Sequence, residues 1–158
     1  MSVQGDNVAK YAKAEAAAKI KEGINNDNKY GQWFGMNNQP WCAMFVMWCF
    51  SAARVKDKII KTASCEVLEK WGHDSGLLVN PLLVQAGDVV LFDFHNQGKS
   101  VHVEIATGPI DTATHLIPTV GGNTAKDGAG SQANGDGVYV KKRQINVVRA
   151  VIHPKWDE

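Results

Sequence analysis

Cys42 stands where the chain could hold a reactive thiol. It follows Pro40 and opens a mostly apolar, uncharged run that continues to Ala53. Proline fits the first position of a helix, where its missing N–H costs nothing, so we predict a buried helix over residues 41 to about 54. The helix dipole and the free N–H groups of the first turn would stabilise a thiolate and lower its pKa. Cys42 is therefore a candidate nucleophile, and a buried structural cysteine is the alternative.

The other two of the three cysteines fit structural roles better. Cys49 lies about two turns beyond Cys42 on the same apolar helix, and Cys65 begins a later helix without a following apolar run. No two cysteines form a CxxC motif. An odd number leaves at least one thiol free, which suits a reducing compartment or a working nucleophile.

A thiolate nucleophile needs a base, and His102 is the best of the five histidines for this role. Residues 100–106 alternate between apolar and polar side chains, which predicts a strand, and His102 shares its face with Glu104. A strand holds a side chain more rigidly than a loop does. An exposed histidine on a half-buried strand is the alternative.

A third group must orient the imidazole ring, and two residues are candidates. Asn123 follows Gly121-Gly122, just after the strand expected beyond His102. Turn chemistry is the alternative for this asparagine, because Asn tolerates left-handed backbone. Glu104 is the other candidate, but neighbours on one strand face stand roughly parallel, so we expect its side chain not to turn toward the histidine.

The elements that must position these residues come as helices first and strands second. Helices are expected from an Asp6 cap to about Gly23, and from a Ser64 cap to about Gly72, in addition to the Cys42 helix. The expected strands cover residues 89–92, 100–106, 116–120, 138–140 and 145–152, with a Gly-rich loop over 121–137. This order predicts an α+β fold, an antiparallel sheet with the helices packed on one side.

Composition excludes several classes of function. The 158 residues, 44% hydrophobic and 21% charged, predict one soluble domain over residues 1–158. A net charge of +1 lacks the basic footprint of a nucleic-acid-binding protein. The longest apolar run is too short to span a bilayer, and residues 1–21 have no signal-peptide core, so we expect no membrane insertion and synthesis in the cytoplasm.

No motif of the sequence predicts a metal or a cofactor. The cysteines and histidines lack zinc-ligand spacing, the aspartates match no EF-hand, and the glycines form no phosphate-binding loop. The run Lys141-Lys142-Arg143 is expected to be a solvated strand end rather than a binding patch.

Taken together, these residues resemble the CHAP family of cysteine- and histidine-dependent amidohydrolases and peptidases, most of all the catalytic modules of bacteriophage endolysins. The blocks occur in family order between residues 30 and 152. They are Tyr30-Gly31 with Trp33 and Gly35, Pro40-Trp41-Cys42-Ala43-Met44-Phe45-Val46-Met47-Trp48, Gly87-Asp88-Val89-Val90-Leu91-Phe92, His102-Val103-Glu104-Ile105, Gly122-Asn123-Thr124, and Gly137-Val138 before a basic strand.

The resemblance implies a papain-like fold of the NlpC/P60 type, with Cys42 as nucleophile, His102 as base and Asn123 as orienting amide. Many members carry an acidic residue where this chain has Gly121, so a Cys–His–Asn triad is expected rather than a four-residue site. Some members bind calcium through aspartates upstream of the cysteine. Only Asp27 stands in that stretch here, so no calcium is expected.

The implied substrate is an amide bond of bacterial peptidoglycan, cleaved through a thioester by an N-acetylmuramoyl-L-alanine amidase or an endopeptidase. The Cys42 backbone N–H would donate to the oxyanion, with Gln39 or Gln32 as side-chain donors. Trp33 and Trp41 would line the substrate groove, with core packing as the alternative for Trp41.

The endolysin resemblance also implies a location and a mode of action. We expect a monomer that reaches the cell wall by holin-type release and carries no separate wall-binding domain within this chain. Two alternatives stay open. One is a bacterial effector or housekeeping wall hydrolase of the same fold, and the other is a catalytically silent wall-binding or phage structural module.

Overall fold

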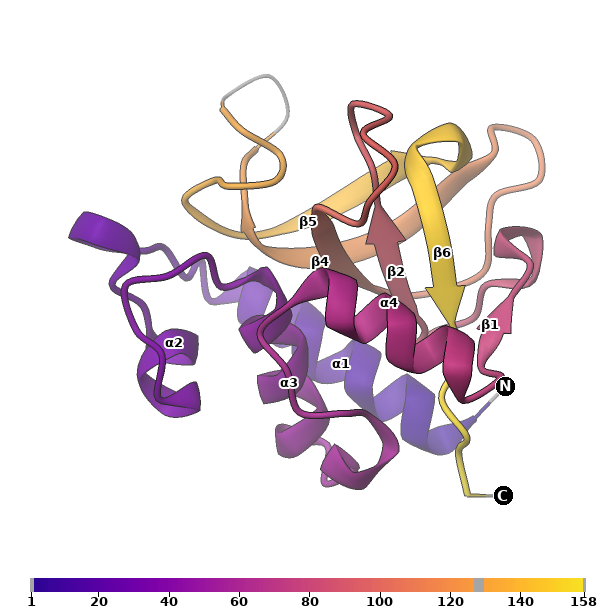
Figure 1. Cartoon of the computed structure of the whole chain (residues 1–158), viewed down its shortest axis with the longest axis horizontal. Helices are drawn as coiled ribbons and strands as arrows, with labels where there is room; N and C mark the ends of the chain where they lie inside the picture. Colours follow the sequence, from indigo (N-terminus) through magenta and orange to yellow (C-terminus); the bar gives the residue numbers. More distant parts are fainter. Residues whose placement is uncertain (1, 127–129, 158) are drawn as a thin grey trace.

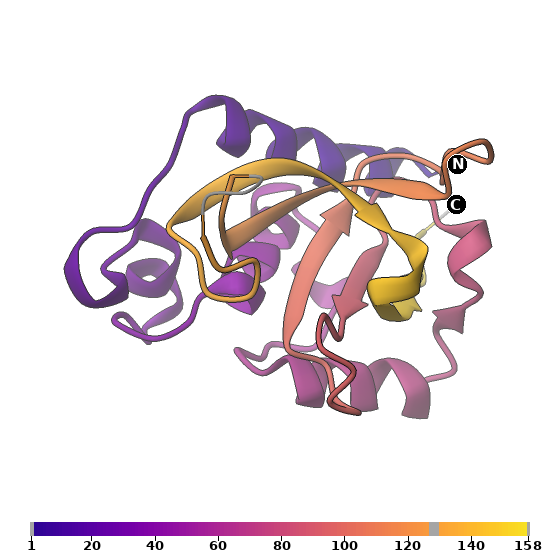
Figure 2. The same cartoon turned by 90° about the horizontal axis from the view of Figure 1, so that it is seen from above.

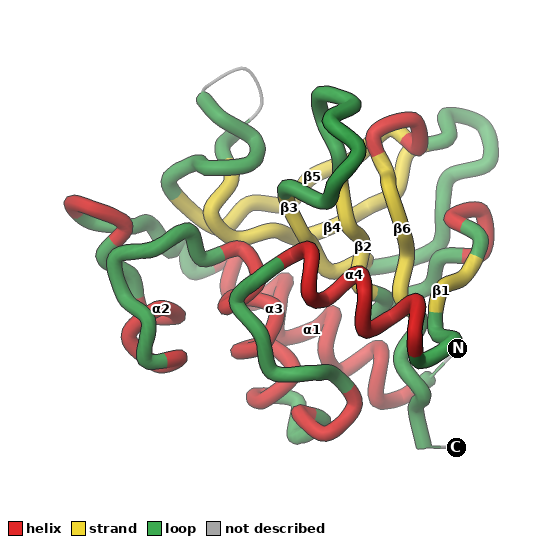
Figure 3. The backbone as a smooth tube through the Cα atoms, in the orientation of Figure 1, coloured by secondary structure: helices red, strands yellow, loops and turns green. Residues whose placement is uncertain are grey.

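The computed structural model describes residues 2–126 and 130–157, and helices precede strands along the described chain (Figures 1 and 3). The helices are α1 (Val3–Ala17), α2 (Lys29–Phe34), α3 (Cys42–Ala52) and α4 (Cys65–Asp74). The strands are β1 (Leu78–Val79), β2 (Val89–Phe92), β3 (His102–Ala106), β4 (Leu116–Thr124), β5 (Gly137–Gln144) and β6 (Val148–Ile152). The predicted α+β class is confirmed.

The six strands form one antiparallel sheet in the order β1-β6-β2-β3-β4-β5. Helices α1 and α3 pack against β3 and β4, and α4 contacts β6 (Figures 1 and 2). Val103 and Ile105 of β3 join the apolar core between the helices and the sheet, whereas Ala106 joins a second apolar cluster on the opposite face. The alternation predicted for this strand is therefore confirmed. Glu104 belongs to the face turned away from the helical core, and His102 shares that face but, as the first residue of β3, lies at the strand end within reach of Cys42.

Helix α3 is the buried centre of the fold, as its apolar sequence predicts. Its start differs from the expectation, because Trp41 is the N-cap, with non-helical φ −123° and ψ 16°, and Pro40 lies before it. Cys42 is thus the first helical residue. Trp41 is fully buried and stacks on Tyr30, with ring centroids 5.4 Å apart, so burial of the indole fixes where the helix begins.

Both ends of helix α1, which stops at Ala17 rather than near Gly23, and the whole of helix α2 were not foreseen. Helix α1 begins earlier than predicted, because Ser2 rather than Asp6 is the cap and accepts from the Gly5 N–H at 3.4 Å. The short helix α2 lies in a stretch for which the sequence pattern predicts no helix. Asn28 caps it by accepting from two backbone N–H groups, and Gly35 ends it at φ 90°.

Strand β4 continues to Thr124, into the stretch expected to be a Gly-rich loop, of which residues 127–129 lie outside the described part. Glycine permits this extension because β4 crosses α3 closely: a Cβ at Gly122 would lie 2.7 Å from the Cβ of Phe45. At the other end of the sheet, Ile145–Val147 forms a 3-10 turn, so β6 begins later than predicted. No helix of the described residues is long and apolar enough to cross a membrane.

Candidate active site

Cys42 lies where the first turns of two helices meet the start of a strand. It is the first residue of α3, and its Sγ lies 3.7 Å from the Sγ of Cys65, the first residue of α4. Cys42 is 6% exposed. The free N–H groups of the first turn of α3 surround the thiol with positive potential, which favours a thiolate.

The pKa of Cys42 is held well below its ordinary value. A hydrogen bond from the Cys65 thiol is the main cause, and it acts against burial, which raises the pKa. Interactions with His102 and with the Val103 backbone N–H lower the pKa further. The same contact and burial raise the pKa of Cys65. Cys42 is therefore the ionised member of the sulfur pair and Cys65 the protonated one.

His102 is fully buried at the start of β3, where it packs against two aromatic rings. The ring centroids of Phe92 and Phe94 lie 6.0 and 5.7 Å from the imidazole centroid. Burial opposes the charge on the ring, but Cys42 and Glu104 outweigh it and raise the pKa of His102 to about 9. At neutral pH the site thus favours an imidazolium beside a thiolate.

Glu104 orients the imidazole, contrary to the expectation that the two side chains stand parallel. The Nε2 of His102 lies 2.9 Å from Glu104 Oε2. Both side chains are long enough to lean along the strand and meet across the spacing of about 6.5 Å between alternate Cα atoms. With Nε2 engaged, Nδ1 of His102 has no hydrogen-bond partner among the described residues, so Nδ1 is the nitrogen left to serve the sulfur.

Arg143 of β5 fixes Glu104 in turn. Its Nε and Nη2 donate to the two carboxylate oxygens at 2.9 and 2.6 Å, and the Thr119 hydroxyl donates to Oε1 at 2.6 Å. Burial raises the pKa of Glu104, but Arg143 and His102 outweigh it and lower this pKa to about 2. The carboxylate therefore stays charged and acts as a fixed anchor for the histidine.

The position of Arg143 corrects the expectation of a solvated basic strand end. Arg143 and Lys141 are buried, because alternate residues of β5 face inward. The guanidinium also donates to the side chains of Gln132 at 2.8 Å and Thr124 at 3.1 Å, and its centre lies 5.0 Å from the Phe94 ring centroid. Strand alternation through the basic run was the sequence signal that could have predicted the burial of Arg143.

Gly121 makes room for the Glu104 carboxylate. A Cβ at this position would lie 2.6 Å from the carboxyl carbon of Glu104, well inside contact distance. Residues of β4 pair with β3 immediately beside this point, with Val120 opposite Ile105. Position 121 must therefore lack a side chain if Glu104 is to reach His102.

Asn123 is buried in this region but makes no hydrogen bond to His102. Its side-chain nitrogen and oxygen have no partner among the described residues. Its backbone is left-handed, φ 53°, within an irregularity of β4 between Gly121 and Thr124. Asparagine tolerates such left-handed backbone, and here it occurs within β4. The side chain that is hydrogen-bonded to His102 in the described structure is that of Glu104.

Within the described residues, neither glutamine proposed as an oxyanion donor is hydrogen-bonded to Cys42. Gln39 is exposed, and Gln32 donates to the Asp27 carboxylate at 2.9 Å. The donors that the geometry does supply are the free backbone N–H groups of the first turn of α3, beginning at Cys42.

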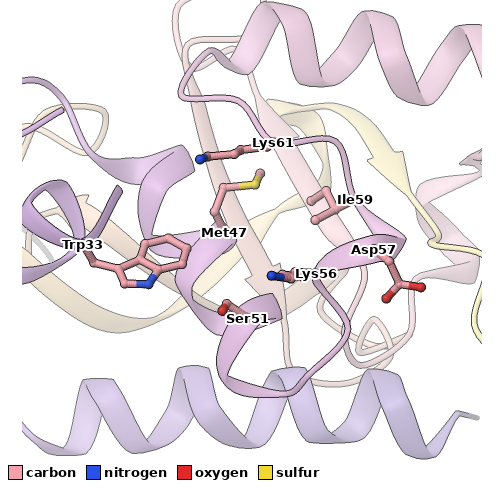
Figure 4. Close-up of a pocket in the computed structure, with 7 residues that line it drawn as sticks. All are labelled: Trp33, Met47, Ser51, Lys56, Asp57, Ile59 and Lys61. Atoms are coloured by element: carbon pink, nitrogen blue, oxygen red, sulfur yellow. The ribbon is translucent and has the colours of Figure 1, made fainter. Parts of the chain in front are cut away.

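The two tryptophans expected to line a groove lie in different surroundings. Trp41 belongs to the core, so the core-packing alternative is correct for it. Trp33 is 46% exposed and lines a cavity of about 510 Å³ that includes neither Cys42 nor His102 (Figure 4). Its other lining residues are Met47, Ser51, Lys56, Asp57, Ile59 and Lys61.

The remaining chemistry-bearing groups lie outside the site. Cys49 is fully buried, and burial raises its pKa well above the ordinary value, which matches its expected structural role. Within residues 2–126 and 130–157, no three His, Cys, Asp or Glu side chains gather as a metal site would require.

Comparison of the chain with protein-family models, with curated protein sequences and with solved structures finds no match. The function must therefore be argued from the site itself. Cys42, His102 and Glu104 are the candidates for a nucleophile, a base and a positioning carboxylate, the three roles that thiol-dependent acyl transfer requires.

Proposed function

We propose that this protein is a cysteine hydrolase that cleaves an amide bond of bacterial peptidoglycan, with a papain-like arrangement of the CHAP type. One observation carries the proposal. A thiol with a lowered pKa begins the central helix, beside a buried histidine whose raised pKa depends on that thiol and on Glu104. A purely structural cysteine buried in an apolar core has a raised pKa, as Cys49 does.

The reaction begins with the Cys42 thiolate and the His102 imidazolium. The thiolate attacks the scissile carbonyl carbon, and the oxygen takes up negative charge against the free N–H groups at the start of α3. His102 gives its proton to the leaving amine as the carbon–nitrogen bond breaks, and a thioester remains. His102 then takes a proton from water, whose oxygen attacks the thioester and releases the carboxylic acid and Cys42.

Glu104 acts through His102 and does not touch the reacting atoms. Its carboxylate holds Nε2, so that Nδ1 serves the sulfur and the leaving group, and its charge stabilises the imidazolium. Arg143 keeps that carboxylate ionised and immobile. The proposed catalytic residues are therefore Cys42 and His102, with Glu104 as the positioning residue.

The departure from the CHAP pattern at Gly121 has a structural explanation under this proposal. Many members carry an acid at that position, and here the space beside β4 is filled by the Glu104 carboxylate from β3. An acidic group thus reaches the histidine from the neighbouring strand. The site keeps the charge while changing the residue that supplies it.

The substrate class rests on the CHAP resemblance of residues 30–152, and so do action at the cell wall, release from the cytoplasm and a monomeric state. The experiment that tests the class is digestion of purified peptidoglycan, with mass spectrometry of the soluble fragments. A new muramoyl terminus identifies an amidase, and a new peptide terminus identifies an endopeptidase.

Cys42→Ala should abolish fragment release, whereas Cys49→Ala, the matched control from the same helix, should retain most of it. Circular dichroism confirms that both variants fold. Undiminished release by a folded Cys42→Ala protein would overturn the enzymatic proposal, and intact walls after treatment with wild type would overturn the substrate class.

A further inference from the structure

Two cysteines that the sequence does not pair lie in contact at the candidate active site. The Sγ atoms of Cys42 and Cys65 are 3.7 Å apart, so they need to approach by about 1.7 Å to reach the length of a disulfide bond. Each is the first residue of its helix, α3 and α4. The hydrolytic reaction assigns no step to Cys65.

The pair is built asymmetrically, as an oxidation-sensitive pair requires. Cys42 is buried and carries the thiolate, the form that reacts with oxidants. Cys65 is protonated and partly exposed, and its sulfur lies beside that of Cys42, which would be oxidised first. The third cysteine, Cys49, is fully buried within the apolar core, and in the described structure its thiol is hydrogen-bonded to neither of the other two.

We propose that Cys42 and Cys65 form a reversible disulfide when the protein meets a peroxide, with Cys65 as the resolving residue. The Cys42 thiolate attacks one peroxide oxygen, the O–O bond breaks, and a sulfenic acid and hydroxide form, the hydroxide becoming water on protonation. The Cys65 sulfur then attacks the sulfenic sulfur as its proton leaves. The S–O bond breaks, water departs, and the S–S bond forms. Two thiols are oxidised and one peroxide is reduced to two waters.

The disulfide has two consequences. Cys42 is no longer a nucleophile until a thiol reductant restores it, so hydrolysis stops reversibly. Cys42 is also protected from further oxidation to sulfinic and sulfonic acids, which thiols do not reverse. The loss of hydrolysis rests on the proposed function, whereas formation of the bond does not.

The test treats the folded, reduced wild-type protein with hydrogen peroxide at a small molar excess, then measures intact mass, free thiols and the cross-linked peptide. Wild type should lose two hydrogens in mass and two of its three thiols, and the linked peptide should join residues 42 and 65. Dithiothreitol should return all thiols. Cys49→Ala, the matched control, should form the same link.

Cys65→Ser provides the decisive comparison because it keeps a small hydrogen-bonding side chain but cannot resolve the sulfenic acid. Its Cys42 should gain two or three oxygens in mass, and dithiothreitol should not remove them. The proposal is overturned if wild type gains oxygen at Cys42 as this variant does, if its thiols remain free, or if the link includes Cys49. A link formed in a wild type that never hydrolyses peptidoglycan would refute the proposed function and leave this inference standing.

Discussion

Replacement of Glu104 by glutamine separates the charge of the positioning residue from its shape. Glutamine keeps an oxygen and a donor within reach of His102 but removes the negative charge that faces the imidazolium. The substitution also leaves the buried guanidinium of Arg143 without a charged partner, because a neutral amide replaces the carboxylate that both of its hydrogen bonds to Glu104 reach. The substitution therefore acts on both turnover and stability.

The two effects have different expected sizes. A hydrogen bond to a charged group contributes about 1.5–3 kcal/mol, so loss of the carboxylate should slow turnover by about 10- to 100-fold. The wild-type rate should fall as pH rises through about 9, the pKa of His102. In Glu104→Gln this alkaline limit should move to lower pH. Breaking the buried pair should lower stability by about 3–5 kcal/mol.

The assay is the rate of peptidoglycan fragment release from pH 5 to 10, with thermal midpoints measured in parallel. Asn123→Gly is the matched control, because it deletes the amide that has no hydrogen-bond partner in the described structure and glycine keeps the left-handed backbone. It should retain most of the wild-type rate. Near-normal turnover in Glu104→Gln together with collapse in Asn123→Gly would refute this reasoning and assign the orienting role to the amide.

A double variant covers the case in which Glu104→Gln folds poorly. Adding Arg143→Met removes the unpaired buried charge and fills its space with an apolar side chain. The double variant should regain part of the lost thermal stability without regaining turnover or the alkaline limit near pH 9. Recovery of the rate along with stability would show that the carboxylate serves only the fold.

Three further outcomes are expected. Gly121→Ala should displace the Glu104 carboxylate and lower both turnover and the thermal midpoint. Gly108→Ala is the control, because its Cβ would lie at an ordinary 3.7 Å from its nearest neighbour, and it should change neither quantity. Equal behaviour of the two variants would show that the Cβ at position 121 does not displace Glu104. The pKa of Glu104 is lowered from 4.5 to about 2, so its contribution, on the order of 3 kcal/mol, is complete above pH 4.5 and lost as pH falls through 2. The acid-side fall of the thermal midpoint should therefore be shallower in Glu104→Gln. Chelation with EDTA should leave turnover unchanged, because the thiol reaction needs no Lewis acid; a loss restored by calcium would reveal a site that includes Asp27.

The sequence was sufficient to predict the helices-then-strands order and the position of Cys42 and His102. Apolar periodicity reports burial, and burial selects α3 as the central helix and sets the two faces of β3. The Ser64 cap of α4 also formed as predicted, since a cap depends on local backbone N–H groups alone. These features depend on neighbours in sequence.

The ion-pair network around Glu104 could not be read in the same way. Arg143 reaches Glu104 across the sheet, and their contact depends on the strand order β3-β4-β5 and on the space left by Gly121. The contact between Cys42 and Cys65 depends on how the loop between α3 and α4 returns the second helix to the first. Such long-range packing leaves no local pattern. The one local signal for a buried Arg143 was the alternation of β5, in which every second residue faces inward. Three consecutive basic residues concealed that alternation.

The proposed mechanism requires Cys42 to be an activated thiolate paired with His102. This pairing is tested by the rate at which iodoacetamide alkylates each cysteine as a function of pH, located by peptide mapping, in wild type and in His102→Ala. We predict that Cys42 of wild type is labelled first, already rapidly at pH 6, with loss of hydrolysis in proportion, and that the substitution shifts this reactivity to higher pH. Labelling led by Cys65, or a Cys42 rate that rises only near pH 9 in both proteins, would contradict the account.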